Sequence, residues 1–116
     1  MRGASLLLVV LAAAPAAHAA KGTAVGVSQE EFRIAVHRDR VPAGVVRFIV
    51  TNLGEDAHDL VVRRKGRVVA RLEEVGAGGQ ATLRTRLRTP GRYRLVCTVA
   101  DHEARGMRSV LRVVSR

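Results

Sequence analysis

One short segment of this 116-residue chain carries three side chains that can bind a soft metal ion. Cys97, His102 and Met107 follow one another in the pattern C-x4-H-x4-M. Thiolate and thioether sulfur favour Cu(I), and imidazole also binds Cu(II), so these donors suit copper. A fourth donor, His58, comes earlier, after Asn52-Leu53-Gly54. The sequence therefore predicts one copper ion with two His and one Cys in a trigonal plane and Met107 as the long axial ligand.

Two of these residues also have simpler interpretations. A single cysteine in a strand is usually a small buried apolar residue, and a methionine is usually core packing. Cys97 is the only cysteine in the chain, so it has no intramolecular disulfide partner. The ordered set of His58, Cys97, His102 and Met107 favours metal binding, and Met107 depends most on that order.

The elements that must position these donors are predicted to be short β-strands. Alternation of apolar and polar residues, with turns rich in Gly, Pro and Asn, predicts an all-β sandwich of about seven or eight short strands. The turns include Val41-Pro42-Ala43-Gly44, Gly76-Ala77-Gly78-Gly79 and Thr89-Pro90-Gly91. No ten-residue helical stripe is present. The β-like runs are 32–36, 46–51, 59–63, 67–73, 82–87, 93–97 and 110–114.

With these motifs, the sequence resembles the cupredoxins, the blue copper proteins that include plastocyanin and azurin. The likeness runs from the Val41–Gly44 turn to the Cys97–Met107 loop and its following strand. It implies a cupredoxin-like Greek-key β-sandwich, with the metal site at one end and near the surface. In the family, a polar residue after the first ligand ties its strand to the cysteine loop. This implies that Asp59 hydrogen-bonds around Thr98; the alternative is an exposed aspartate at the end of a strand.

The loop departs from the family pattern beside the second histidine. Many relatives carry Pro-Gly there, whereas this chain has Ala100-Asp101, which places a carboxylate next to His102. Charged residues also surround His102, where electron carriers often present an apolar patch. Copper binding is compatible with these changes, but they argue against efficient electron transfer to the usual partners.

The N-terminus predicts export. A basic residue, Arg2, precedes the apolar run 5–14, and Ala17-His18-Ala19 matches an A-x-A cleavage site. We expect residues 1–19 to be a signal peptide and residues 20–116 to be one copper-binding domain in the periplasm or outside the cell. The alternative is an uncleaved anchor, which the short run interrupted by Pro15 disfavours.

The net charge of +10 bears on the class of binding partner. Export and the scarcity of aromatic residues argue against nucleic acid as the partner. The charge instead favours solubility and steering toward acidic partners, with peripheral contact at a membrane surface as an alternative. We expect a monomer whose partner is a redox protein or a copper donor or acceptor.

Three functions fit these residues. The first is one-electron transfer by an exported type 1 copper protein that cycles between Cu(I) and Cu(II). The second is copper trafficking or storage with the same ligands. The third is a metal-free binding module with vestigial donors. Four protein donors would leave no open position for a substrate, so we do not expect an enzyme.

Overall fold

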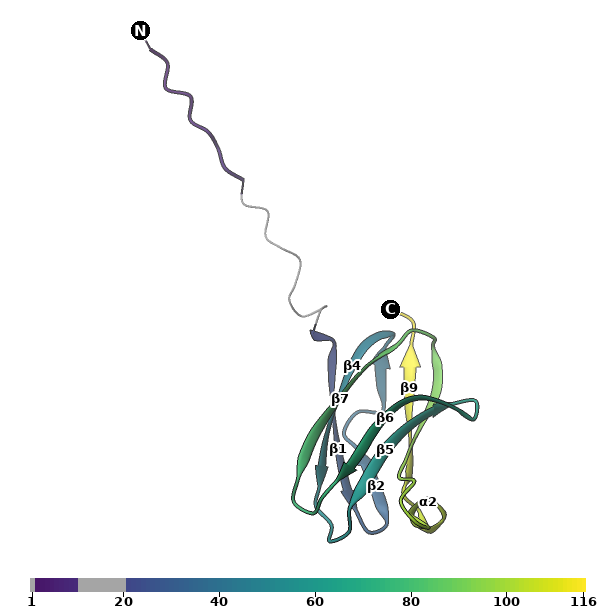
Figure 1. Cartoon of the computed structure of the whole chain (residues 1–116). Helices are drawn as coiled ribbons and strands as arrows, with labels where there is room; N and C mark the ends of the chain where they lie inside the picture. The colour runs from purple at the N-terminus through teal and green to yellow at the C-terminus, as the bar shows by residue number, and fades with distance from the viewer. Residues whose placement is uncertain (1, 11–20) are drawn as a thin grey trace.

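Two β-sheets face each other in this protein (Figure 1). The structure is a computed structural model that describes residues 2–10 and 21–116. The first sheet has the strand order β2-β1-β4-β7, and the second has the order β3-β9-β8-β5-β6. The strands are β1 (Thr23–Glu30), β2 (Arg33–Val36), β3 (Arg40–Pro42), β4 (Gly44–Asn52), β5 (His58–Arg64), β6 (Arg67–Val75), β7 (Gln80–Leu87), β8 (Gly91–Val96) and β9 (Arg108–Val114).

The predicted all-β sandwich is confirmed, and the period-two patterns show which side chains face inward. Val46, Phe48 and Val50 of β4 are all buried, because alternate residues of a strand point to the same face. Tyr93 and Leu95 of β8 lie in the same core from the opposite sheet. Burial of this apolar surface between the sheets is the main stabilising contribution, at roughly 25 cal/mol per Å².

The structure corrects the prediction at two strands. β1 was not among the predicted runs, yet it pairs in parallel with β4 along its length. The Val41-Pro42 pair was predicted to be part of a turn, whereas Arg40–Pro42 forms β3, which pairs in parallel with β9. Proline is compatible with this position because β3 is an edge strand. On the outer side of an edge strand the backbone has no neighbouring strand to which an N–H would donate.

The end of the sandwich that carries His58 and Cys97 also carries a one-turn helix, α2 (His102–Arg105). Figure 1 shows α2 between β8 and β9, at the end of the molecule opposite the C-terminus. The left-handed backbone of Gly106 (φ +127°) ends this turn, and the Gly106 N–H donates to the carbonyl of Glu103 at 3.1 Å. Glycine suits this position, since an added Cβ would lie 3.0 Å from the carbonyl oxygen of Phe32.

Residues 2–10 form no helix or strand, and their side chains are exposed. The expected cleavage site at Ala17-His18-Ala19 lies outside the described residues, and so do residues 11–14 of the predicted apolar run. Within the described part of the chain, no helix is long and apolar enough to cross a membrane.

Candidate metal centre

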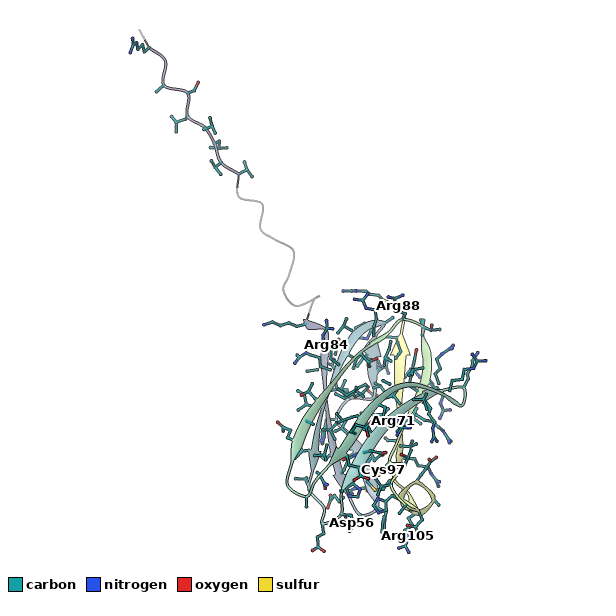
Figure 2. The ribbon with its side chains drawn as sticks, viewed as in Figure 1. Asp56, Arg71, Arg84, Arg88, Cys97 and Arg105 are labelled. Carbon is teal, nitrogen blue, oxygen red and sulfur yellow. The ribbon has the colours of Figure 1, made fainter. Side chains whose placement is uncertain are left out.

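The pairing of β5 with β8 brings His58 to Cys97 and His102, which lie about 40 residues later in the chain. His58 is the first residue of β5, and Cys97 directly follows the last residue of β8. The two strands are antiparallel, with Val61 opposite Val96, so the start of β5 and the end of β8 lie together. His102 reaches the same point as the first residue of α2. Figure 2 shows Cys97 at this end of the sandwich.

The three donor atoms form a small, buried triangle. His58 Nδ1 and His102 Nδ1 are 3.2 Å apart. Cys97 Sγ lies 3.7 Å from His58 Nδ1 and 3.6 Å from His102 Nδ1. Three donors that each stand about 2 Å from a shared ion in one plane would be separated by about 3.5 Å. The arrangement therefore fits one metal ion, and its thiolate and imidazole donors fit copper.

Burial keeps the thiol protonated in the metal-free protein. Cys97 has no exposed surface, and burial raises the pKa of its thiol. Metal binding must displace that proton, because the thiolate is the form that coordinates. The same burial makes Cys97 a poor target for external oxidants.

The fourth predicted donor, Met107, is buried beside the triangle. Its side chain has no exposed surface and belongs to the same core cluster as Cys97. Its backbone closes the loop, since the Cys97 N–H donates to the Met107 carbonyl at 3.1 Å. The Met107 N–H donates in turn to the His102 carbonyl at 3.0 Å. Axial ligation by its thioether remains a prediction.

Asp59 joins β5 to the loop that follows Cys97. The backbone N–H of Thr98 donates to Asp59 Oδ1 at 2.6 Å, and the Thr98 hydroxyl donates to Asp59 Oδ2. Asp59 is buried, so the alternative of an exposed strand-end aspartate does not apply. The Gln29 side-chain amide, from β1 in the other sheet, donates to the Asp59 carbonyl at 2.7 Å. These contacts restrain the backbone beside two of the three donors.

Glu31 is a residue of this site that the sequence did not reveal. Its Oε1 lies 2.9 Å from His58 Nε2 and also accepts the Asp56 N–H at 2.7 Å. Hydrogen bonds from the backbone of Asp56, and then of Glu55, lower the pKa of Glu31 to about 2. An ionised carboxylate can only accept, so the proton of a neutral His58 stays on Nε2, which leaves the Nδ1 lone pair free.

His102 also has a carboxylate beside its outer nitrogen. Asp56 Oδ2 lies 3.3 Å from His102 Nε2. The neighbouring Asp101, which the sequence placed beside His102, instead accepts from Arg105 Nε at 2.8 Å, and this contact lowers the Asp101 pKa. The Phe32 ring packs against the imidazole with its centroid 5.3 Å away. His102 is consequently almost fully buried, at 5 % exposed.

The sequence and the fold have relatives among known proteins. A family model described as "Cupredoxin-like domain" matches residues 3–108. No curated protein matches the sequence. A reduced auracyanin from Roseiflexus castenholzii aligns with 19 % identity and a TM-score of 0.63, covering 84 % of this chain and 99 % of its own. An azurin from Methylomonas sp. strain J aligns with 12 % identity and a TM-score of 0.68, covering 80 % of this chain and 98 % of its own.

Proposed function

Because the chain belongs to the cupredoxin-like domain family, we propose that it is an exported type 1 copper protein that carries one electron at a time. The observation that supports this most is the convergence of His58 Nδ1, His102 Nδ1 and Cys97 Sγ at one buried point. Similar structures include auracyanin A from Chloroflexus aurantiacus, described as a "blue" copper protein (14 % identity, TM-score 0.66). Met107 completes the proposed ligand set.

Bound copper would supply a one-electron Cu(I)/Cu(II) couple. The residues of this chain would limit the structural change at the site when the copper changes its oxidation state. Asp59 restrains the backbone at Thr98, and Glu31 fixes the His58 ring. The three donor atoms lie within 3.7 Å of one another, which is close enough to share one ion. Donors that are held in place lower the cost of alternating between two oxidation states.

Voltammetry and metal analysis test this function together. We expect one copper ion per chain and a reversible one-electron wave, with Cys97→Ser removing the wave. Glu30→Gln provides a matched surface control, since Glu30 pairs only with exposed Arg33. Stoichiometric copper with an irreversible wave would contradict electron carriage but not copper binding.

Copper trafficking is the second candidate, and the charged surroundings of His102 favour it. Asp56 faces the imidazole, and Glu103 and Asp101 follow and precede His102 in the chain. Trafficking predicts rapid transfer of Cu(I) to a chelating acceptor and slow electron exchange. Measuring both rates on one copper-loaded sample separates the two functions: a transfer rate above the exchange rate would favour trafficking.

The proposal includes export, with residues 1–19 removed as a signal peptide and residues 20–116 as the mature domain. Intact-mass measurement of the protein recovered from outside the cytoplasm should give a chain that begins at Ala20. A mass corresponding to the uncleaved chain would contradict this part of the proposal.

A further inference from the structure

The outer face of the five-stranded sheet carries a concentration of positive charge. Arg92 and Arg94 point outward from β8, because Tyr93 and Leu95 between them point into the core. Arg108 and Arg112 point outward from β9 by the same alternation around buried Leu111. Neither β8 nor β9 contains an acidic residue. With Arg63 of β5 and Lys65 of the β5–β6 turn, these residues define the basic sheet face.

The strand register brings like charges together across this face. Arg63 lies opposite Arg94, and Arg92 lies opposite Arg112. Arg40 of the edge strand β3 lies opposite Arg112 on its other side. Like charges directly opposite one another destabilise a sheet. The facing arginines therefore lower the stability of this sheet.

Most of these arginines have no internal counterion. Within the described part of the chain, no carboxylate pairs with Arg92, Arg94 or Arg108. Arg63 is the exception, since its Nη1 lies 3.0 Å from Glu103 Oε1 and 3.1 Å from Oε2. Unpaired guanidinium groups in fixed positions can form paired hydrogen bonds with carboxylates.

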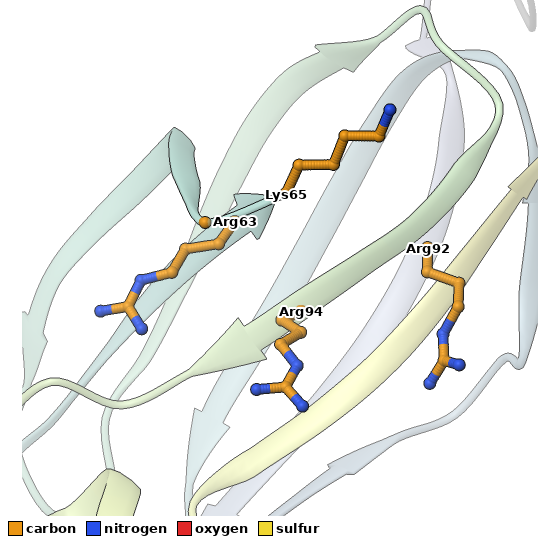
Figure 3. Close-up of a pocket in the computed structure, with 5 residues that line it drawn as sticks. Arg63, Lys65, Arg92 and Arg94 are labelled. Atoms are coloured by element: carbon orange, nitrogen blue, oxygen red, sulfur yellow. The ribbon is translucent and has the colours of Figure 1, made fainter.

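The basic sheet face is hollowed where these side chains meet. A groove of about 510 Å³ is lined by Arg63, Lys65, Gly66, Arg92 and Arg94. Figure 3 shows the side chains of Arg63 and Lys65 approaching from β5 and the turn after it, and those of Arg92 and Arg94 from β8. A second hollow of about 160 Å³ shares Arg94 and continues toward Arg108 and Val110. An extended acidic segment could occupy both.

This face lies next to the metal centre on the side of Cys97. Arg94 lies on β8, three residues before Cys97, which directly follows that strand. Val96 lies opposite Arg108, the residue after Met107. The Arg63–Glu103 ion pair links the face to the residue that follows His102. At the α2 end, by contrast, Asp56 faces His102 and Asp101 pairs with Arg105. An acidic partner is therefore attracted to the sheet face and not to the His102 end.

From these observations we infer that the basic sheet face docks an acidic surface of a protein partner, which exchanges its electron with the copper centre from the Cys97 side. Docking itself requires no metal; the electron exchange rests on the proposed function. In the exchange, one electron passes between the redox centre of the partner and the copper centre, so that one is oxidised and the other reduced, and no proton or chemical bond is transferred. Charge complementarity of this kind acts mainly on association rate and specificity.

Docking is tested with the metal-free protein and a synthetic octaglutamate peptide as the probe. Backbone-amide NMR shifts should change along β8 and β9, and the double variant Arg92→Glu/Arg94→Glu should weaken binding about tenfold. The matched control Arg86→Glu/Arg88→Glu changes the net charge equally, but Arg86 lies on β7 in the other sheet. The control should weaken binding only about twofold, through long-range charge. Equal losses in both variants would overturn a specific docking face.

Vesicles decide between a protein partner and a membrane. Phosphatidylcholine vesicles containing phosphatidylglycerol present phosphate groups on a flat surface instead of carboxylates on a protein. We expect the protein to bind these vesicles more weakly than it binds the peptide. If it binds the vesicles more tightly, and the Arg92→Glu/Arg94→Glu variant abolishes that binding, a membrane and not a protein is the partner.

The electron route is tested separately on the copper(I) protein with hexacyanoferrate(III), an anionic oxidant. The rate constant for oxidation should be about tenfold lower in the Arg92→Glu/Arg94→Glu variant than in the control variant. Peptide binding without this rate difference would overturn the Cys97-side route while leaving the docking face intact. A protein that binds the peptide but no copper would contradict the proposed function alone.

Discussion

Each imidazole of the metal centre has a carboxylate at its outer nitrogen, Glu31 for His58 and Asp56 for His102. Such partners hold the ring orientation and raise the basicity of the donor nitrogen. Glu31 has a second role, since its carboxylate also accepts the backbone N–H groups of Glu55 and Asp56. One side chain thus restrains both the histidine and the segment that leads to it.

The stability of the metal-free protein should reflect this role of Glu31. Its pKa is lowered from 4.5 to about 2 in the folded state, so its contribution is complete above pH 4.5 and is lost as the pH falls toward 2. Glu31→Gln should lower the urea midpoint at neutral pH and reduce the loss of stability between these pH values. Urea unfolding across the acid range measures both effects, with Glu30→Gln as the control. Parallel pH curves for wild type and Glu31→Gln would contradict the prediction.

Met107→Leu distinguishes an axial ligand from a core residue. The substitution nearly conserves volume, so the fold should lose less than about 1.5 kcal/mol. If the thioether donates to copper, its removal disfavours Cu(II), and the reduction potential should rise while copper remains bound. Voltammetry gives the answer, and an unchanged potential would show that Met107 serves only in packing.

The donor residues could be predicted from sequence because their types and order are distinctive. Cys97, His102 and Met107 lie within one loop, and His58 opens a strand that the β-pattern indicates. The role of Glu31 could not be predicted, because Glu31 lies 27 residues before His58 and contacts it only in the folded chain. The carboxylate beside His102 was expected from Asp101, whereas chain folding brings Asp56 there instead.

At the level of elements, the site depends on how β5 is fastened to the loop after β8. Asp59 bonds to both the backbone and the hydroxyl of Thr98, and Gln29 reaches Asp59 from the opposite sheet. Two strands, β1 and β5, and the loop after β8 are thereby joined around His58 and Cys97. Hydrogen bonds to a charged group are each worth about 1.5–3 kcal/mol.

Removing the Asp59 carboxylate should therefore destabilise the metal-free protein. We expect Asp59→Ala to lower the free energy of unfolding by about 2 kcal/mol, because it leaves the partly buried Thr98 N–H without its acceptor. Asp59→Asn keeps an acceptor oxygen and should lose about half as much. Urea unfolding with an unchanged m-value measures the difference. Equal losses for the two variants would show that burial, and not the hydrogen bond, determines the effect.

The seven predicted strands are present, and the structure explains why the others were missed. Of the three buried positions of β1 only Val25 and Val27 are apolar, since the third is Gln29, so the apolar alternation is too short to stand out. β3 has three residues and contains Pro42, which by itself indicates a turn. α2 has only four residues, too few to produce a helical period. Parallel pairings and very short elements depend on tertiary contacts that local patterns do not contain.

Across the whole molecule, the net charge of +10 is unevenly placed. The basic sheet face has arginines opposite arginines, while the end with α2 has Asp101 paired with Arg105 and Glu103 paired with Arg63. Repulsion of this kind opposes the compact state, and salt screens it over about 10 Å at 0.1 M.

Moderate salt should therefore stabilise the metal-free protein. We expect the midpoint of thermal unfolding to rise by a few degrees, roughly 2–4 °C, when sodium chloride is raised to about 0.2 M. The rise should be smaller in Arg92→Glu/Arg94→Glu, where the sheet face carries less charge. Circular dichroism at several salt concentrations measures it, and a lower midpoint in salt would mean that attractive pairs dominate.

We propose that Cys97, His58 and His102 hold copper in a trigonal site. The absorption spectrum of the protein after addition of one equivalent of Cu(II) tests it most directly, because thiolate coordination in such a site gives an intense blue colour. We predict a saturating blue band that disappears on reduction, returns on reoxidation and is absent in Cys97→Ser. A colourless or weakly coloured complex, or a band that survives in Cys97→Ser, would contradict the account.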